Sequence, residues 1–355
     1  MAAEMINKRS DIIIFIGIAS YFASSMPGTI KCIILYINRK RVGRMINSLH
    51  FAPFALNKCR GGKKEENILK SLVRKTNIQN IIYISTTLGT LLFGIINTLY
   101  YRLRYWYDSS LWVMPYAPTM PWFDYSSSPI YEYGALFQCF SMLIYAIQIG
   151  NSFSIFIGLL AHISIQMVIL SNAFRNLKIR AENLQKLDDD KSKPFEHYVN
   201  IIFRENINHH LQIFELANEM EKLYSVIILI LMFSCTVIMC FVLYCCLVFP
   251  VFSMFFLQNA TFSCIIFCHI AMYCYWGNEV SETSLGVAQA AAEVDWVDLP
   301  GHIPKSLIMV IIRAQKPLRI TAGKFFPLNM ATFMSIMRGT FSFLMFFKES
   351  QELSN

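Results

Sequence analysis

The chain has 355 residues and a formal net charge of +8; 55% of the residues are hydrophobic, 14% are aromatic and 15% are charged. A soluble domain carries about 25% charged residues, so this composition excludes a disordered or collagen-like chain and argues against a soluble enzyme. The apolar residues lie in runs of about 20, the number that crosses about 30 Å of hydrocarbon as a helix. Strand alternation with polar lumen positions is absent from the sequence. We therefore predict an all-α polytopic membrane protein.

Six apolar spans are predicted along the chain. In order, they are 11–37, 79–101, 131–170, 223–249, 251–276 and 325–347. The third is long for one crossing, because about forty residues make roughly 60 Å of helix. It is either one helix that continues past the bilayer or two short spans broken at 148–152.

The basic residues favour the single long helix. If the third span is one helix, three gaps share a side and hold most of the lysines and arginines: 38–78, 172–222 and 277–324. The outer gap 102–130 then has only Arg102 and Arg104, and Lys348 follows the last span. Lys and Arg accumulate in cytoplasmic loops, and a split third span would break this rule. We therefore predict that the basic gaps are cytoplasmic and that both ends of the chain are extracellular.

The outer gap 102–130 is rich in aromatic residues, and its prolines keep most of it from being helical. The aromatic residues are Tyr105, Trp106, Tyr107, Trp112, Tyr116, Trp122, Phe123 and Tyr125. Tyr and Trp gather at membrane interfaces, so much of this set fits an interfacial belt. A lid over an outer cavity is the other interpretation, and the sequence leaves both open.

The cytoplasmic stretch 205–224 is predicted to be an amphipathic helix that runs directly into the fourth span. Its apolar residues recur every three positions: Leu211, Phe214, Ala217, Met220 and Leu223. An apolar face in the cytoplasm needs a partner. Packing on the rest of this chain and contact with another subunit are both consistent with the pattern.

The last span, 325–347, carries one small and polar stripe on an otherwise apolar helix. This polar stripe consists of Asn329, Thr332, Ser335, Gly339 and Ser342. Such a stripe either packs against another helix or lines water. Arg338 lies beside it at mid-span, where an arginine costs roughly 2.5–3.5 kcal/mol on insertion scales. Its side chain either points to water or a neighbouring helix, or reaches the interface.

The sequence contains no motif for catalysis or for a cofactor: no phosphate-binding glycine loop, no HExxH and no nucleophile elbow. The adjacent His209 and His210 would point about 100° apart on a helix, which does not suit a zinc site. The ten cysteines lie in apolar runs or on the cytoplasmic side, so no structural disulfide is expected. We predict no enzyme activity, no metal, no cofactor and no nucleic-acid partner.

The C-terminal third contains the most specific pattern. It comprises Tyr273-Cys274, Gly277, Ser281, Ser284, Ala291, Trp296 and Leu299-Pro300. It continues through Arg313-Ala314-Gln315-Lys316-Pro317-Leu318 and the Phe- and Ser-rich last span. This sequence pattern resembles the insect odorant receptor family, most strongly over 270–347. Weaker matches upstream extend the resemblance over essentially the whole chain.

The resemblance implies a seven-span fold in the plasma membrane of sensory neurons, with a cytoplasmic N-terminus and an extracellular C-terminus. It implies the odorant-binding subunit of an odorant-gated cation channel. The partners would be odorant co-receptor subunits in a heterotetramer, membrane lipid and a small, neutral, volatile ligand. The first span found here matches the second of the family, so we expect that the family's first span is missing from this chain.

The chain is expected to divide into five segments by role. Residues 1–171 hold the outer-facing ligand-binding helices and the long third helix, 172–222 the cytoplasmic linker and anchor helix, and 223–276 the fourth and fifth spans. Residues 277–324 form a cytoplasmic anchor segment, and 325–355 hold the pore-lining last span and the extracellular C-terminus.

The resemblance also implies roles for particular residues. The family's ligand pocket lies in the outer half of the bundle, and the residues placed there are Ile18, Tyr21, Phe22, Gly94, Thr98, Phe137 and Ser141. The last four are placed by depth alone, and ordinary helix packing is the alternative for each. The pore would be lined by the polar stripe, with Met345 as the gate and Lys348 at the entrance.

Two other functions are less consistent with the sequence. A gustatory-type channel subunit would be expected to end its last span in a Thr-Tyr…Gln-Phe motif, which this sequence lacks. A transporter would need inverted repeats or helices broken at mid-membrane, and the sequence shows neither.

Overall fold

The structure is a computed structural model that describes residues 12–57, 59–116, 127–188, 192–251, 253–297 and 299–354. Side chains are described at these positions except 12–24, 110, 347 and 350–354. The helices are α2 (Ile12–Ile37), α3 (Arg39–Ser48), α4 (Gly62–Arg104), α5 (Ile130–Arg175), α6 (Leu177–Leu187), α7 (Phe195–Val248), α8 (Met254–Ala292), α9 (His302–Ala314) and α10 (Met330–Ser354). The remaining elements are the short 3-10 helix η1 (Ser109–Leu111) and the strands β1 (Thr321–Ala322) and β2 (Phe326–Pro327).

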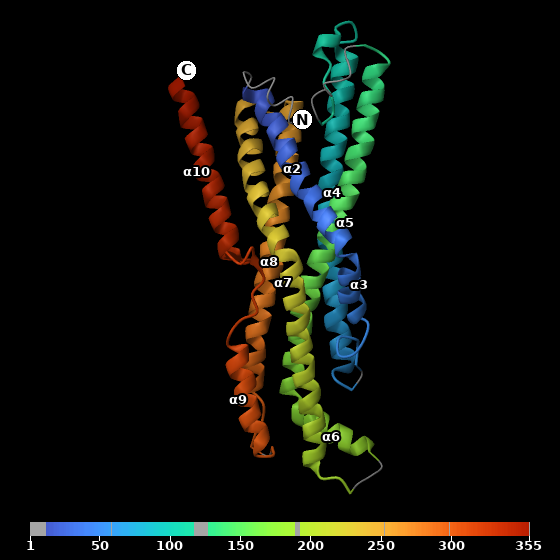
Figure 1. Ribbon diagram of the computed structural model, residues 1–355, viewed down its shortest axis with the longest axis vertical. Coiled ribbons are helices and arrows are strands. Elements are labelled where there is room, and N and C mark those ends of the chain that lie inside the picture. The colour runs from blue at the N-terminus through green and yellow to red at the C-terminus, as the bar shows by residue number, and fades with distance from the viewer. Residues whose placement is uncertain are drawn as a thin grey trace.

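The long helices α4, α5, α7 and α8 form an elongated bundle (Figure 1). Among the described residues, these four helices are long and apolar enough to cross a membrane. They coincide with the second to fifth predicted spans. The first and last predicted spans fall on α2 and α10, whose shorter apolar stretches are Ser25–Ile37 and Met330–Phe346.

The prediction of one long third helix is confirmed, because α5 is unbroken over Ile130–Arg175. Its two halves have different surroundings. In the outer half, the apolar side chains of Phe140 and Ile147 are 63% and 57% exposed, whereas Phe153 and Phe156 in the inner half are fully buried. The outer half thus presents an apolar surface suited to lipid, and the inner half lies at the centre of a protein core.

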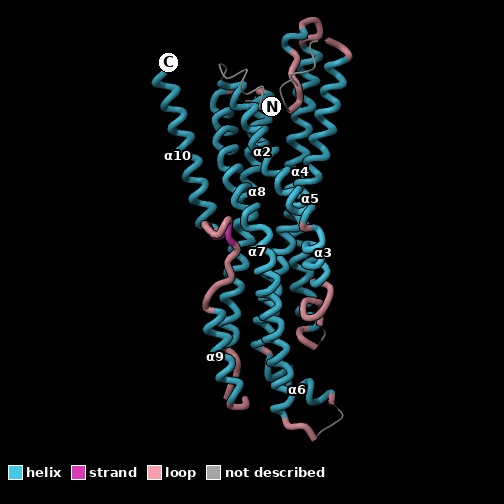
Figure 2. The backbone as a smooth tube through the Cα atoms, in the orientation of Figure 1, coloured by secondary structure: helices cyan, strands magenta, loops and turns pink. Residues whose placement is uncertain are grey.

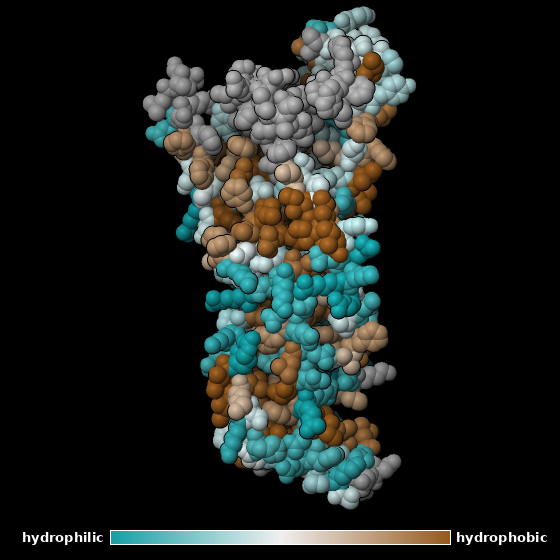
Figure 3. All heavy atoms as spheres, viewed as in Figure 1, coloured by the Kyte–Doolittle hydropathy of each residue, from teal (hydrophilic) through white to brown (hydrophobic). Residues whose placement is uncertain are grey.

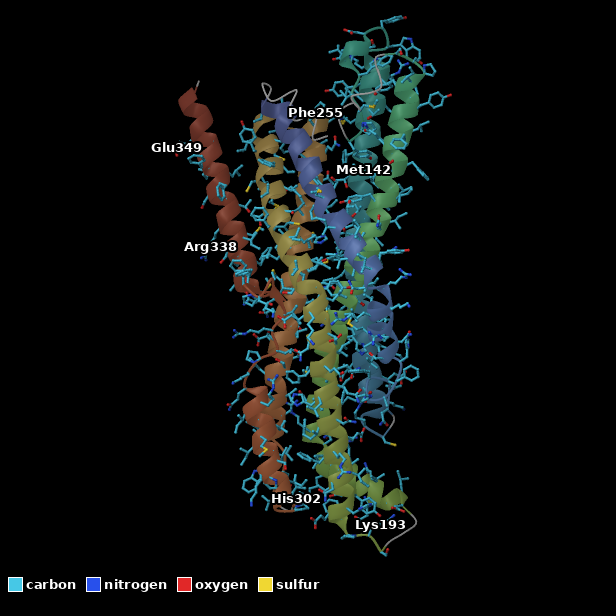
Figure 4. All side chains as sticks on the ribbon, in the orientation of Figure 1. Met142, Lys193, Phe255, His302, Arg338 and Glu349 are labelled. Atoms are coloured by element: carbon cyan, nitrogen blue, oxygen red, sulfur yellow. The ribbon has the colours of Figure 1, made fainter. Side chains whose placement is uncertain are left out.

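The surface of the molecule shows the same division. On the face seen in Figure 3, hydrophobic residues cover much of the upper half, and hydrophilic residues cover most of the lower half. The labelled Lys193 and His302 lie at the lower end, whereas Phe255 and Glu349 lie near the upper end (Figure 4). The lower half is therefore the part that carries the basic gaps.

The predicted amphipathic helix is confirmed as part of α7, which runs over Phe195–Val248 without a break. Phe214, Ala217 and Met220 of its apolar face are buried within this chain, where α7 packs against α2, α5, α6 and α8. Leu211, however, is 62% exposed, so its place in the predicted apolar face was wrong. A three-residue repeat turns back by about 60° per step on a helix of 3.6 residues per turn, and Leu211 has rotated off the buried side.

A buried ion pair stabilises the inner end of the bundle. The Arg60 guanidinium contacts both carboxylate oxygens of Glu65, and each side chain is 2% exposed. Arg60 also donates to the backbone carbonyls of Pro53 and Ala55 in the loop before α4. Burying a charge costs several kcal/mol, and its partner offsets that cost only while both members are present.

A second polar contact joins α5 and α7 beside this ion pair. His209 Nε2 and Gln166 Oε1 are 2.9 Å apart, and Gln166 Nε2 donates to the carbonyl oxygen of Phe54 at 3.0 Å. Burial of the ring, followed by repulsion from the nearby Arg60 charge, lowers the pKa of His209 to about 3. His209 is therefore neutral near pH 7 and serves as a hydrogen-bonding residue between the two helices.

A β-hairpin occupies the start of the last predicted span (Figure 2). The turn between β1 and β2 has Gly323 and Lys324 in the left-handed region, with φ of 61° and 63°. α10 begins only at Met330, and Asn329 caps it, since Asn329 Oδ1 accepts from the Thr332 N–H at 2.8 Å. The last span thus begins later than predicted, and Asn329 precedes the helix that carries the rest of the polar stripe.

Replacing Glu65 with Gln is expected to lower the free energy of unfolding by about 3–5 kcal/mol, because Arg60 would stay buried without its carboxylate. Thermal unfolding of the purified protein in detergent would measure this loss. The matched control is Glu66→Gln at the neighbouring exposed pair with Lys70, which should change stability by about 0.5 kcal/mol or less. Equal losses in the two variants would contradict a special role for the buried pair.

Candidate ligand site

Two of the residues predicted to bind ligand face the interior of the outer bundle. Gly94 and Thr98 lie about one turn apart on α4 and are buried, with Thr98 only 6% exposed. Phe137 and Ser141 instead lie on the exposed side of α5, and Phe137 is 57% exposed. The buried residue of α5 at this level is Gln138. The structure brings the first two residues together with Gln138, but not with Phe137 or Ser141.

The other three predicted ligand residues lie on α2. Ile18, Tyr21 and Phe22 belong to the helix Ile12–Ile37, which packs against α5 and α7, but their side chains lie outside the described residues. Their part in ligand binding stays a prediction from the family resemblance.

Tyr116, from the loop between α4 and α5, fills the space beside Gly94. Its side chain is 6% exposed, and its hydroxyl donates to the carbonyl oxygen of Leu91 on α4. A Cβ at position 94 would lie 2.7 Å from Tyr116 Cζ, nearer than real Cβ atoms come, so only glycine lets the ring sit there. The backbone N–H of Tyr116 donates to Gln138 Oε1 at 3.3 Å. A loop residue thus closes the outer space between two helices.

Two amide side chains connect the same loop to α8. Gln258 Nε2 donates to the carbonyl oxygen of Pro115 at 3.2 Å, and Asn97 Nδ2 donates to Gln258 Oε1 at 3.4 Å. Asn97 Oδ1 and Thr98 Oγ1 are buried and have no hydrogen-bond partner among the described residues. A buried polar atom without a partner costs about 1–3 kcal/mol. A few such atoms in an otherwise apolar pocket are suited to orienting a bound small molecule.

We call this group of residues the outer site. Its members come from α4, α5, α8 and the loop, and they are Leu91, Gly94, Asn97, Thr98, Tyr116, Gln138 and Gln258. Gly94 and Thr98 were predicted from the sequence as ligand residues and Tyr116 as part of the aromatic loop that could form a lid, whereas Leu91, Asn97, Gln138 and Gln258 were not predicted. Asn97 and Gln138 could have been found from the sequence, because each is a polar residue next to one that had been placed at the depth of the site. No local pattern indicates that a loop tyrosine folds inward.

Arg102 holds the rest of the described loop against the outer end of α4 and α5. Its guanidinium carbon lies 4.4 Å from the centre of the Trp106 ring and 3.9 Å from that of Trp112. Arg102 also forms an ion pair with Glu132 on α5, with 2.8 Å between nitrogen and oxygen. This stacked arrangement fixes the start of the loop that ends in Tyr116.

The described aromatic residues of the loop divide between the two predicted interpretations. Tyr116 is buried over the bundle, whereas Tyr107 of the same loop is fully exposed and fits the interfacial-belt interpretation. The other predicted aromatic residues of this gap, Trp122, Phe123 and Tyr125, lie outside the described residues.

A buried lysine, Lys31, was not among the residues predicted from the sequence. Lys31 on α2 is 1% exposed, and its Nζ donates to the Tyr273 hydroxyl on α8 at 2.9 Å. His269 stacks on Tyr273 with ring centres 4.9 Å apart. The signal was present in the sequence, because an ionisable residue within a membrane span is expensive to bury and marks a functional or partnered position. Here it joins α2 to α8.

Three members of the polar stripe, Ser335, Gly339 and Ser342, lie on the side of α10 that faces away from the rest of the chain. α10 packs against α7 and α8 and buries Phe333 and Thr340, which are 7% and 2% exposed. Ser335 and Ser342 are exposed, and a Cβ at Gly339 would meet nothing within 4 Å. Among the described residues, this outer part of the stripe is therefore not used for packing within the chain, whereas Asn329 and Thr332 bond near the start of α10.

The remaining predicted pore residues lie along the same helix. Thr332 is half-buried near its start, where the hydroxyl donates to the Pro327 carbonyl at 2.7 Å. Met345 is 48% exposed, and Lys348 beyond it is exposed. Arg338 is exposed and points away from the bundle (Figure 4), so its charge is not buried against α7 or α8.

The sequence profile described as 7tm Odorant receptor matches residues 14–341. The chain belongs to the insect odorant receptor family. Odorant receptor 10 of Aedes albopictus is 27% identical over 65% of this chain and 58% of its own length. Odorant receptor Or2 of Anopheles gambiae is 26% identical over 39% of this chain and 37% of its own length. The matched part of this odorant receptor thus spans less than two thirds of these relatives.

A solved structure gives the same fold. The olfactory receptor OR5 from Machilis hrabei, in complex with eugenol, superposes with a TM-score of 0.78 at 16% identity, covering 96% of this chain and 82% of that one. At this identity the likeness shows the fold alone. The predicted fold class and family are confirmed: this odorant receptor is an all-α, multi-pass membrane protein.

Replacing Gly94 with Ala is expected to push the Tyr116 ring out of its position and to lower stability by about 1–3 kcal/mol through overpacking. Thermal unfolding in detergent would measure this loss. In a Tyr116→Ala background the same change should cost little, because the clash is gone. Gly89→Ala is the matched control, since a Cβ there would lie 3.7 Å from Thr261 Cγ2, an ordinary contact. A loss that persists without Tyr116 would contradict the described contact.

Proposed function

We propose that this odorant receptor is the odorant-binding subunit of a heteromeric, odorant-gated cation channel in the plasma membrane of olfactory neurons. Co-receptor subunits complete the heterotetramer, and the ligand is a small, neutral, volatile molecule. The observation that carries the channel assignment is the outward-facing part of the polar stripe on α10, which is Ser335, Gly339 and Ser342. Small and polar residues that an otherwise apolar helix turns away from its own chain are suited to lining a shared pore.

The outer site supports the choice of ligand. Its residues are all uncharged, and its polar atoms are amide, hydroxyl and backbone groups rather than carboxylates or amines. Apolar pockets with a few polar groups bind small, neutral molecules. The OR5 receptor of Machilis hrabei was solved with eugenol, a ligand of this class. We place the odorant beneath the Tyr116 loop, with Ile18, Tyr21 and Phe22 of α2 as further contacts, while Phe137 and Ser141 are weaker candidates because they are exposed.

The cytoplasmic end supports assembly with other subunits. On α9, Ile308, Met309 and Ile312 are 56%, 74% and 59% exposed, and Phe325 after it is 75% exposed. Apolar side chains that stay together on a water-facing surface indicate a protein contact. We assign this surface to the anchor between subunits, in addition to the packing of α7 on its own chain.

Lys348 supports a channel of unlike subunits. It follows Met345, our gate candidate, by three residues near the outer end of α10. Four identical copies would bring four lysines to the mouth of a cation channel and repel the permeating ions. Co-receptor subunits without that lysine would dilute the positive charge, so conduction would survive. The charge at this position therefore argues for a heteromer.

Expression of this receptor together with a co-receptor is expected to give odorant-evoked cation current, and expression of either alone is not expected to reproduce the response. Whole-cell recording against an odorant panel would measure it, with surface labelling to show that the complex reaches the membrane. Surface-expressed complexes that respond to nothing in a broad panel, or a receptor that responds equally well alone, would contradict the proposal.

In the heteromer, Lys348→Glu is expected to raise divalent-cation permeability or inward current, because it turns a repelling charge into an attracting one. Met345→Ser is expected to increase current without ligand, because an apolar ring closes a pore by excluding water. Lys186→Glu on the exposed, peripheral α6 is the control and should change neither. If both α10 variants reach the surface with unaltered conductance, selectivity and basal opening, this end of α10 does not line the pore.

A further inference from the structure

The ring of Tyr116 occupies the outer site in the manner of a bound ligand. It comes from a loop rather than a helix, it is buried against Gly94, and its hydroxyl donates to a helix carbonyl, that of Leu91. Chemically, this side chain is 4-methylphenol attached to the backbone. The hydroxyl bond and the backbone bond to Gln138 are both neutral, and each contributes only about 1 kcal/mol net. The ring is thus seated by neutral groups that a ligand carrying the same ring and hydroxyl can imitate.

The seated ring leaves part of the outer site without hydrogen bonds. Asn97 and Thr98 are 2% and 6% exposed, yet Asn97 Oδ1 and Thr98 Oγ1 have no partner in the described part of the chain. Thr98 lies one turn outward from Gly94 on nearly the same face of α4. A free ligand that placed a hydroxyl on either atom would gain an interaction that Tyr116 does not make. Such a difference in interaction is what allows a ligand to replace a group of the protein.

We propose that Tyr116 is a displaceable plug of the outer site, and that an odorant carrying a hydroxyl on a flat ring takes its place. The inference rests on the proposed function in one respect, since it takes the outer site to be the odorant site. The ligand ring sits where Gly94 has no side chain, and its hydroxyl bonds Thr98 Oγ1, which has no partner among the described residues while Tyr116 is in place. Tyr116 then sets specificity, because only a ligand that matches its ring and hydroxyl replaces it well.

The test uses the purified full chain in detergent and two probes of nearly equal shape. The first is 4-methylphenol, and the second is 1,4-dimethylbenzene, which has a methyl group in place of the hydroxyl. Titration calorimetry gives the dissociation constant of each probe, and thermal unfolding confirms that each variant is folded. 4-Methylphenol is expected to bind the wild-type chain more tightly than 1,4-dimethylbenzene by about fivefold, the equivalent of one net hydrogen bond.

Tyr116→Phe is the decisive variant. Its ring fills the same space, so no cavity is created, but the bond to Leu91 is lost and the plug is held less tightly. 4-Methylphenol should therefore bind Tyr116→Phe several-fold more tightly than it binds the wild-type chain, within the roughly tenfold range of one hydrogen bond. Tyr107→Phe, at the fully exposed tyrosine of the same loop, is the matched control and should leave binding unchanged. Unchanged binding in Tyr116→Phe would show that Tyr116 is a fixed strut and would overturn the proposal.

Two further variants locate the hydroxyl. Tyr116→Ala should bind 4-methylphenol about tenfold or more tightly than wild type, because no plug has to move. Thr98→Val, which keeps the shape of the side chain, should weaken 4-methylphenol binding and leave 1,4-dimethylbenzene binding unchanged. Loss of both probes in folded Thr98→Val, or equal preference for both probes in Tyr116→Ala, would contradict hydroxyl recognition at this site.

The binding measurement separates this proposal from the channel function. If the variants shift probe binding as expected while the co-expressed channel gives no odorant current, the proposed function fails and the plug stands. If odorants evoke current but Tyr116→Phe leaves both probe binding and odorant sensitivity unchanged, the plug fails and the channel function stands.

Discussion

A polar group removed from water has to find a partner inside the chain, and this constraint governs each level of the odorant receptor. At the inner end, Arg60 meets Glu65 and two backbone carbonyls. In the middle of the bundle, Lys31 on α2 meets the Tyr273 hydroxyl on α8. The Lys31–Tyr273 bond joins two helices far apart in sequence, whereas Arg60 holds the loop before α4 to the start of that helix. Because a charge left alone in a dry interior costs several kcal/mol, each pairing also fixes the segments that it joins.

The outer site is the converse case, in which buried polar atoms lack a partner within the described part of the chain. There the protein leaves Asn97 Oδ1 and Thr98 Oγ1 without partners among the described residues. The helices around them carry otherwise apolar surface, so these two atoms are the polar features that a small molecule can use. A binding site in a membrane protein can thus be recognised by the hydrogen bonds that the fold leaves unmade as well as by its shape.

The helix α8 contacts both the candidate ligand site and the candidate pore helix. Near its outer end, Gln258 bonds the loop beside Tyr116. Further along, Phe267 packs edge-on against Phe333 of α10, and Gly277 lies directly against Leu328 before α10. A side chain at position 277 would not fit there. Along this route α8 is one continuous helix, so it connects the candidate ligand site directly to the candidate pore helix.

By itself, the sequence determined where the helices lie, that α5 is one long helix and that the amphipathic stretch 205–224 continues directly into the fourth span as α7. These properties follow from the length and periodicity of apolar runs and from the placement of charges, which are local along the chain. It also carried the family resemblance and the depth of Gly94 and Thr98. Only the tertiary structure decided which face of each helix is buried: Gln138 rather than Phe137 faces inward.

The same limit explains the other differences. Leu211 is exposed because a three-residue repeat moves around the helix by about 60° per step, and the hairpin before α10 forms through pairing that no local pattern indicates. Tyr116 enters the outer site because a glycine on α4 leaves room for its ring and amides on α5 and α8 hold its backbone. That juxtaposition depends on three helices packing together. The depth of a residue in the membrane follows from its position within an apolar run. The rotation of a helix and the path of a loop depend instead on contacts between segments that are distant in the sequence.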